Sequence, residues 1–224
     1  MTRICRFLSP GVCLLVCWLS SNAQTPPTAP RPLGRVELFN GRDVSGWAFA
    51  TWSNAPASAT WNVRNGVIHR EGQPYVYART TSAYQDYRLI VEWRFVKVAP
   101  GANSTGVQVN IQSPDEVWPR CIQCQGKLDR QGDLFLMSGA ESNEHRGMDA
   151  NQPVPLRGPS NEKPVGEWNT REVVCAGNTV RAYINSRFMD EVTRCNISTG
   201  TIGIQSEGGE IEIRKMYLQP LKPL

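Results

Sequence analysis

Three successive segments in the middle of the chain alternate apolar and polar residues with a period of two. They cover residues 88–96, 107–111 and 121–125. Side chains of a strand point alternately to opposite faces of a sheet, so each segment predicts a strand with one face suited to a core and one face that carries hydrogen-bonding groups. If the three strands are neighbours, these groups form one predicted polar wall, consisting of Glu92, Arg94, Gln108, Asn110, Gln123 and Gln125.

The composition of this predicted polar wall favours a sugar as ligand. Four of its six members are amides, and the other two are Glu92 and Arg94, which can form an ion pair. An amide both donates and accepts hydrogen bonds, which suits a ligand rich in hydroxyl groups. We therefore interpret the wall as a sugar site on a β-sheet. The alternative is an ordinary solvated sheet face.

The rest of the chain consists of short strand-like runs between turn residues. Residues 61–69 predict a hairpin around the Asn65-Gly66 turn, and residues 75–79 predict another strand. A three-strand meander is predicted over 169–176, 179–184 and 188–193, and two last strands over 201–205 and 210–218. No segment has a helical pattern. The pattern predicts an all-β fold, a two-sheet antiparallel jelly-roll sandwich, with Trp47, Trp61 and Trp93 in its core.

Two segments interrupt the strand pattern and read as loops. Residues 114–119 and 138–164 are rich in Pro, Gly, Asn and charged residues. The second is long for a compact domain, and long loops of this kind are often functional.

The N-terminus has the pattern of a secretory signal. Arg3 and Arg6 precede a short apolar stretch over residues 12–19, and Ser21-Asn22-Ala23 is a small-x-small cleavage site. The pattern predicts a signal peptide over 1–23, a disordered Pro-rich leader over 24–35 and one folded domain over 36–222, located in the periplasm or secreted. We expect no transmembrane segment in the mature chain, because the apolar stretch is too short to cross a bilayer.

Charge and composition exclude several classes of ligand. The formal charge of +4 falls by two when Arg3 and Arg6 are removed, and the remaining basic residues are scattered, so we expect no nucleic-acid partner. The two histidines, His69 and His145, are far apart in the sequence, which argues against a zinc site. Acidic residues do not cluster in calcium-type loops, and we expect no cofactor.

Four cysteines remain after the signal segment, which is an even number in an oxidising compartment. Cys121 and Cys124 are three apart on a predicted strand, where they face opposite sides and can bond only if the chain bends. Cys175 and Cys195 fall at the same end of the predicted meander, so a disulfide between them is geometrically reasonable.

Several short motifs occur in a fixed order along the chain. They are Leu38-Phe39-Asn40-Gly41 with Ser45-Gly46-Trp47, Trp61-Asn62-Val63 with Asn65-Gly66-Val67, the strand over 87–95, Gly166-Glu167-Trp168-Asn169, and Gly203-Ile204-Gln205-Ser206-Glu207-Gly208. In this order the chain resembles the 3-keto-disaccharide hydrolase family, also described as 3-keto-glucoside 1,2-lyase and 3-keto-2-hydroxyglucal hydratase. The resemblance covers residues 36–220.

The resemblance implies a concanavalin A-like jelly roll that acts on glycosides already oxidised at C3 of the sugar. A ketone at C3 acidifies the hydrogen on C2, so a general base can remove it and expel the C1 substituent, after which water adds to the enone. Such a site needs one base, one acid and hydrogen-bond donors for the enolate oxygen. Ordinary glycoside hydrolysis needs two carboxylates at fixed spacing.

The sequence departs from the family at one position. Close relatives have Glu-Cys-Gln on the central strand, whereas this chain has Gln123-Cys124-Gln125, followed by Gly132-Asp133-Leu134-Phe135. An amide does not take up a proton at neutral pH. Either another group serves as the base, or the domain binds sugar without catalysis.

Three residues are candidates for the catalytic base. Glu207 is the first, because it lies in a turn next to Gln205, which shares the face of the wall, and a turn can aim a carboxylate into a cleft. His145 is the second, in the long loop, because the ordinary pKa of histidine suits proton uptake and delivery. Asp133 is the third, in a hairpin expected to return over the sheet. Each candidate also has an alternative interpretation without a catalytic role. Glu207 would be an exposed glutamate in a turn, His145 a loop histidine without a function, and Asp133 an aspartate that caps its turn.

Substrate binding is assigned to the amides and to two larger side chains. Arg94 and the amides, with Gln205, are expected to hold sugar hydroxyls and the C3 oxygen, and Trp168 to stack on a sugar ring unless it is a buried anchor. The expected partner is an oxidised sugar or glycoside. The alternative functions are a non-catalytic carbohydrate-binding module, which Gln123 favours, and a calcium-dependent lectin or adhesion domain.

Overall fold

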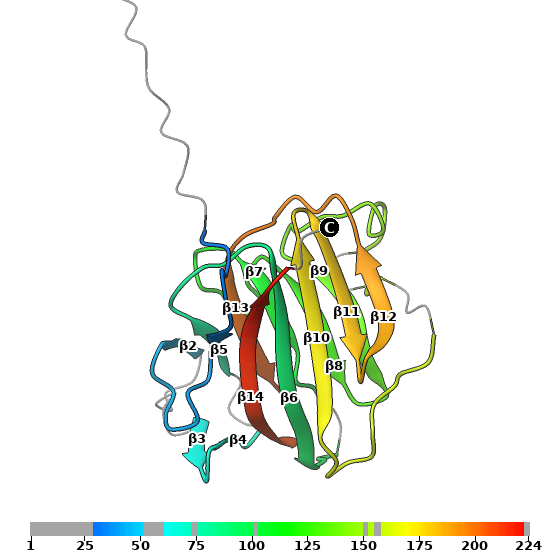
Figure 1. Cartoon of the computed structure of the whole chain (residues 1–224). Helices are drawn as coiled ribbons and strands as arrows, with labels where there is room; N and C mark the ends of the chain where they lie inside the picture. Colours follow the sequence, from blue (N-terminus) through cyan, green and yellow to red (C-terminus); the bar gives the residue numbers. More distant parts are fainter. Residues whose placement is uncertain are drawn as a thin grey trace, which may run out of the picture.

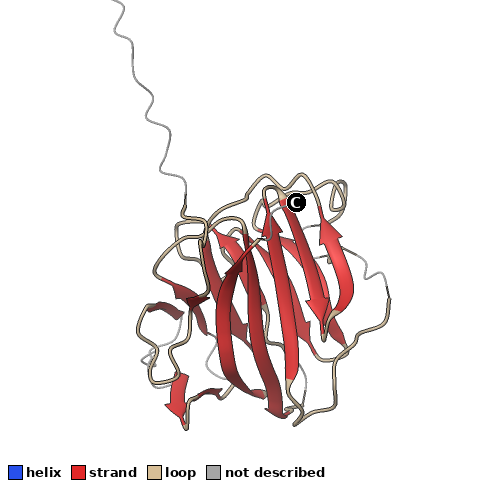
Figure 2. Ribbon diagram, viewed as in Figure 1, coloured by secondary structure: helices blue, strands red, loops and turns tan. Residues whose placement is uncertain are grey.

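The computed structural model describes residues 29–51, 61–72, 76–100, 103–149, 152–154 and 158–221, and these residues form strands, turns and loops without a helix (Figure 2). The predicted signal peptide and the first residues of the predicted leader lie outside this part of the chain. Among the described residues, no helix has the length and hydropathy needed to cross a membrane.

The strands form two antiparallel sheets (Figure 1). The larger sheet has eight strands in the order β12 (Arg187–Val192), β11 (Thr179–Ile184), β10 (Asn169–Ala176), β6 (Tyr87–Lys97), β14 (Glu210–Pro220), β4 (Val67–Arg70) and β3 (Trp61–Arg64), with β1 (Val36–Glu37) paired to β14. The smaller sheet has six strands in the order β2 (Trp47–Thr51), β5 (Val76–Thr80), β13 (Thr201–Ser206), β7 (Val107–Ile111), β8 (Cys121–Lys127) and β9 (Arg130–Met137). The predicted two-sheet jelly-roll sandwich is confirmed.

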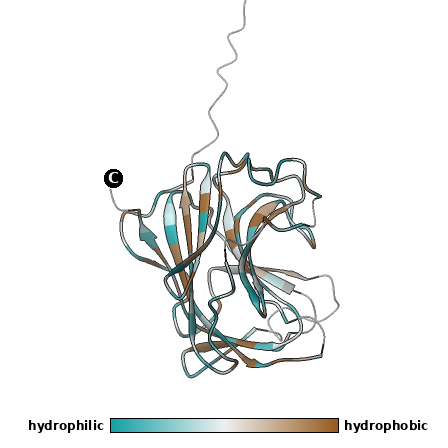
Figure 3. Cartoon of the chain, turned by 90° about the vertical axis from the view of Figure 1, so that its right-hand side faces the viewer, coloured by the Kyte–Doolittle hydropathy of each residue, from teal (hydrophilic) through white to brown (hydrophobic). Residues whose placement is uncertain are grey.

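The core lies between the two layers, which Figure 3 shows edge on. The alternation of β6 buries every second residue, Leu89, Val91, Trp93 and Phe95 among them, in the same cluster as Val107 and Val109 of β7 and Ile122 and Cys124 of β8. Trp47, Trp61 and Trp93 are all buried, as predicted. Apolar burial on this scale is the main source of stability of such a sandwich.

The predicted hairpin turn at Asn65-Gly66 is confirmed. It joins β3 to β4, and both residues have positive φ, 53° and 75°. This backbone is that of the tight turns that connect antiparallel strands, and Asn and Gly are the residues that adopt it at least cost.

The prediction that the segments over 88–96, 107–111 and 121–125 lie side by side is wrong in one respect. β7 and β8 are neighbours in the smaller sheet, but β6 belongs to the larger sheet, where it pairs with β10 and β14. Period two determines which side chains share a face of one strand and does not determine the neighbouring strand. The predicted polar wall is therefore divided between two sheets.

The outer face of the larger sheet carries cross-strand ion pairs, and these explain the positions of Glu92 and Arg94. Glu92 accepts hydrogen bonds from Arg214 and Lys215 at 2.6 and 3.0 Å. Arg94 donates to the Glu212 carboxylate at 2.7 Å. For this strand the solvated sheet face, which the sequence left as the alternative, is what the structure shows.

The four described cysteines are buried free thiols, so the disulfide between Cys175 and Cys195 that the sequence left open does not form. Cys175 belongs to the main core cluster and lies opposite Tyr87 in the pairing of β10 with β6. Cys121 and Cys124 face opposite sides of β8, as strand geometry requires, and belong to different apolar clusters. Burial raises the pKa of Cys124 to about 11 and that of Cys175 and Cys195 to about 12.

These thiols are expected to react slowly in the native protein, because burial keeps them protonated and out of contact with reagent. With a chain that lacks residues 1–23, DTNB should label few thiols in native buffer and Cys121, Cys124, Cys175 and Cys195 after unfolding in urea without reductant. Two thiols in urea in place of four would reveal a disulfide and contradict the structure.

Candidate functional site

The outer face of the smaller sheet carries a cleft of about 430 Å³. Its floor comes from β13, β8 and β9, and its rim from the loops that follow β7, β9 and β13. The residues that line it are Trp118, Gln123, Gln125, Phe135, Met137, Ser138, Gln205 and Glu207.

A chain of amide hydrogen bonds runs along the floor of the cleft. Gln108 Nε2 donates to Gln123 Oε1 at 3.4 Å, and Gln123 Nε2 donates to Gln125 Oε1 at 3.2 Å. The oxygen of Gln125 also accepts from Ser104 Oγ at 2.8 Å and from the Gly126 amide at 3.0 Å. The amides of Gln123 and Gln125 are thus held in one orientation before any ligand binds.

Glu207 is the carboxylate of the cleft, and the backbone fixes its position. It directly follows β13, and its amide and carbonyl exchange hydrogen bonds with Ser104 at 2.8 and 2.9 Å. Gln205 Nε2 donates to its Oε1. Among the lining residues that the structure describes, Glu207 is the one acidic side chain.

An exposed tryptophan forms part of the rim. Trp118 lies in the loop between β7 and β8 and is 40% exposed. Ser138 Oγ donates to its carbonyl oxygen at 2.5 Å, which ties this loop to the loop after β9. With Phe135 on the floor, Trp118 supplies the aromatic surface that sugar rings favour. Trp118 was not among the predicted site residues, although a tryptophan in a Pro-containing loop between two strands of the predicted polar wall is a usable signal.

The loop that carries Trp118 is anchored to the sheet by Asp115. The Tyr77 hydroxyl donates to Asp115 Oδ1 at 2.8 Å, and Arg79 donates to both carboxylate oxygens at 2.7 Å. Hydrogen bonds from Arg79 lower the pKa of Asp115, and burial raises the pKa of Tyr77. The carboxylate therefore stays ionised and the bidentate pair stays intact near neutral pH.

The structure brings five of the predicted site residues together. Gln123, Gln125, Gln205 and Glu207 line the cleft, and Gln108 lies beneath them on β7.

Asn110 does not line the cleft, although it belongs to the same alternation as Gln108. The pairing of β7 with β13 shifts register between Thr201 and Gly203, and Asn110 has a positive φ of 56°. This bulge turns the side chain away, and Asn110 Nδ2 donates to the Ile197 carbonyl oxygen at 3.4 Å.

Trp168, Arg94 and Glu92 lie on the other sheet and take no part in the cleft. The Trp168 ring contacts two guanidinium groups, with that of Arg94 at 4.6 Å and that of Arg214 at 4.4 Å from the ring centroid. These contacts are cation–π interactions on the outer face of the larger sheet. The prediction that Glu92 and Arg94 share one polar wall with the glutamines is therefore wrong, and Trp168, predicted to stack on the sugar, lies away from the cleft.

The two other candidate bases also lie outside the cleft lining. His145 lines a separate cavity in the loop after β9. Asp133 is on β9, 2% exposed, and pairs with Arg130 at 2.6 Å. Burial raises the pKa of Asp133, and the ion pair with Arg130 opposes that shift. Of the three candidates, the structure places Glu207 with the glutamines.

No metal-binding arrangement is evident in the part of the chain that the structure describes. Groups of three or more His, Cys, Asp or Glu side chains that could hold an ion are not found among these residues.

Solved structures with the same fold include several carbohydrate-active proteins. A protein from Parabacteroides distasonis, provisionally assigned as a glycosyl hydrolase, is 20% identical with a TM-score of 0.60, over 84% of this chain and 94% of that chain. The β-glucanase of Bacillus licheniformis is 12% identical with a TM-score of 0.55, over 84% and 99%. A lichenase derived from a mouse hindgut metagenome is 9% identical with a TM-score of 0.53, over 84% and 98%. At these identities the likeness establishes the fold.

The jelly roll and its amide-lined cleft define a carbohydrate-active domain of the glycosyl hydrolase type. A search of curated protein sequences gives no match. The sequence profile of the 3-keto-alpha-glucoside-1,2-lyase-like domain matches residues 34–219, and the chain belongs to this family. The family resemblance seen in the sequence is confirmed.

Proposed function

We propose that the cleft binds a 3-keto glycoside and cleaves it by elimination and hydration, with Glu207 as the base. The observation that carries this proposal is that Glu207 is the one acid among the described residues of a cleft otherwise made of amides and aromatic rings. Retaining and inverting hydrolysis both require two carboxylates across the scissile bond. Elimination requires one base, because the ketone at C3 already activates the C2 hydrogen.

The proposed reaction has two steps. The Glu207 carboxylate takes the proton from C2, the electron pair of the C2–H bond forms the C1–C2 double bond of the enone through an enolate, and the C1–O bond breaks. The leaving oxygen takes up a proton and departs as an alcohol. Water then adds at C1, and C2 regains a proton, which gives the free 3-keto sugar. The sum of both steps is hydrolysis.

The fixed amides supply the second requirement of this chemistry. Negative charge develops on the C3 oxygen when C2 loses its proton, and donors that are already oriented stabilise such charge without reorganisation. The amide groups of Gln123 and Gln125 are held by the hydrogen-bond chain on the cleft floor and are suited to this role. The predicted signal over residues 1–23 supports a site of action in the periplasm or outside the cell.

The test is turnover of 3-keto glycosides by the purified protein. A panel of 3-keto disaccharides with different linkages should release free sugar, with a transient enone absorbance in the ultraviolet. Absence of product from every linkage would overturn the proposal.

A second candidate function is sugar binding without catalysis. The observation that favours it is Gln123, an amide where the family resemblance leads us to expect an acid. Its side-chain oxygen and nitrogen each take part in the amide chain. Calorimetry that detects binding of the same panel without product would select this function.

Trp118 is expected to contribute to sugar binding in either case. Trp118→Ala removes an aromatic face from the rim and should raise KM or Kd about fivefold to tenfold, with kcat changed less. The matched control is Trp168→Ala, which removes an indole from the opposite sheet and should leave KM unchanged. A larger effect of the Trp168 variant than of the Trp118 variant would show that the cleft is not the sugar site.

A further inference from the structure

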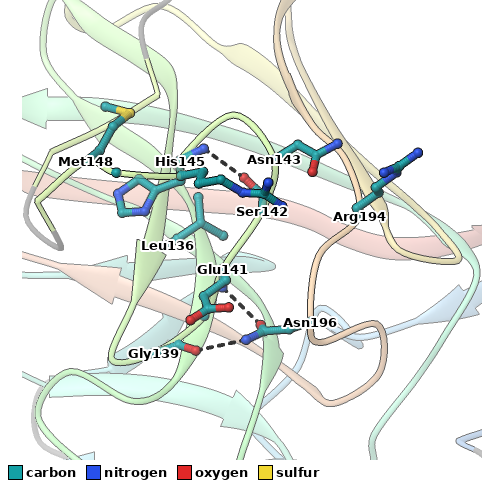
Figure 4. Close-up of a pocket in the computed structure, with 12 residues that line it drawn as sticks. Leu136, Gly139, Glu141, Ser142, Asn143, His145, Met148, Arg194 and Asn196 are labelled. Carbon is teal, nitrogen blue, oxygen red and sulfur yellow. Dashed lines mark hydrogen bonds between the residues drawn. The ribbon is translucent and has the colours of Figure 1, made fainter.

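A second hollow, about 450 Å³ in volume, lies in the loop that follows β9 (Figure 4). Its lining side chains lie in three groups around the hollow. These groups are Arg194 with Asn143, Glu141 with Asn196, and His145 with Met148. This cavity has no part in the reaction proposed above, because Glu207 and the glutamines line the cleft instead.

Hydrogen bonds to the connection between β12 and β13 hold the loop in a defined shape. Asn196 Oδ1 accepts from the Glu141 amide at 2.9 Å, and Asn196 Nδ2 donates to the Gly139 carbonyl oxygen at 3.1 Å. Both carboxylate oxygens of Glu144 accept from Thr193, at 2.6 and 2.7 Å. The cavity walls are therefore set before a ligand binds.

His145 closes one wall and is itself held in place. His145 is 8% exposed, and its Nε2 lies 3.1 Å from the Gln152 carbonyl oxygen. A carbonyl oxygen is an acceptor, so Nε2 carries the hydrogen. The His145 backbone amide donates to Ser142 Oγ at 3.2 Å.

The charge of the lining is positive. Arg146 and Arg194 contribute two guanidinium groups against the single carboxylate of Glu141. Within the part of the chain that the structure describes, neither of these two guanidinium groups forms a hydrogen bond or an ion pair. By contrast, Arg79, Arg88 and Arg181 are each paired with a carboxylate. Glu144, close in sequence to Arg146, is occupied by Thr193.

We propose that this cavity is a second binding site, for a sugar that carries an oxyanion, either a carboxylate or a sulfate group. Guanidinium groups bind planar or tetrahedral oxyanions through paired, charge-assisted hydrogen bonds. Asn143 adds an amide, which suits the hydroxyls of the same sugar.

The cavity shares a wall with the cleft. Met137 and Ser138 line the cleft, and the next two residues, Gly139 and Ala140, line the cavity. The turn is closed by a hydrogen bond of 3.0 Å from the Ala140 amide to the Met137 carbonyl oxygen.

The proposal is tested by calorimetry with D-glucuronate, D-glucose 6-sulfate and neutral D-glucose as probes. One or both anionic sugars should bind more tightly than glucose, with an affinity that falls as salt rises. The double variant Arg146→Gln, Arg194→Asn should lose this affinity about tenfold or more. Asn is chosen at position 194 because the backbone there has a φ of 51°, which Asn tolerates.

Two controls separate this site from the cleft. Arg64→Gln changes an exposed arginine of the β3–β4 hairpin that lines neither hollow, and it should leave the affinity for both anionic sugars unchanged. Glu207→Gln should also leave it unchanged, so failure of the proposed reaction does not affect this test. Equal affinity for glucose and both anionic sugars, or unchanged affinity in the double variant, would overturn the proposal.

Discussion

Replacing Glu207 with Gln is expected to lower kcat for a 3-keto glycoside about 10²–10⁴-fold, with KM nearly unchanged. The amide has the shape of the carboxylate but takes up no proton at neutral pH, so removal of the C2 hydrogen loses its base. Binding should persist, because the glutamines, Phe135 and Trp118 remain in place. The measurement is steady-state release of free sugar.

The matched control is Glu210→Gln, three residues along the chain at the start of β14 and outside the cleft lining. Its kcat should equal that of the unchanged protein. Full activity in the Glu207 variant would show that another group is the base, and His145 and Asp133 would then be examined in the same way.

Replacing Gln131 with Leu is expected to lower the free energy of unfolding by about 3 kcal/mol, because it removes one of the two hydrogen-bond acceptors of the buried Arg171 guanidinium. Arg171 is 1% exposed in the core. Its Nη2 donates to Gln131 Oε1 at 2.6 Å, its Nη1 donates to the Thr105 carbonyl oxygen at 2.8 Å, and its guanidinium lies 4.9 Å from the Trp93 ring centroid. Burial lowers the pKa of Arg171, because the core disfavours the charged guanidinium.

Arg171 also connects the larger sheet to the cleft. Arg171 belongs to β10 and donates to the carbonyl oxygen of Thr105. The next residue, Gly106, accepts a hydrogen bond of 2.9 Å at its carbonyl oxygen from the backbone amide of Gln205, which lines the cleft.

Urea unfolding measures the loss of stability in the Gln131 variant. The control Gln219→Leu, on a partly exposed position of β14, should stay within about 0.5 kcal/mol of the unchanged protein. Equal stability of both variants would contradict the buried-charge account.

The sequence was sufficient for the strands and their faces, because both follow from local properties. The alternation in β6, in β8 and in β7 as far as Val109 correctly separated core residues from outward residues, and the Asn65-Gly66 turn located a hairpin. Gln108 and Gln123 were correctly placed together, because β7 and β8 are consecutive strands that pair directly.

The composition of the cleft depended on pairings and loops that a local pattern does not contain. β6 pairs with β10, more than seventy residues further along the chain, and this pairing takes Glu92 and Arg94 to the other sheet. One extra residue in β7 removes Asn110 from the face that it would otherwise share with Gln108. Trp118 and His145 lie in loops, whose course is set by contacts such as the one between Ser138 and Trp118.

The most direct test of the account follows the C2 hydrogen of the substrate during turnover in D₂O. Elimination followed by hydration predicts deuterium at C2 of the released 3-keto sugar, formed at the rate of cleavage and absent, over the same time, without enzyme or with the Glu207→Gln variant. Released sugar that keeps its original hydrogen at C2 would show that C1–O cleavage does not pass through loss of that proton, and would contradict the role of Glu207 as the base.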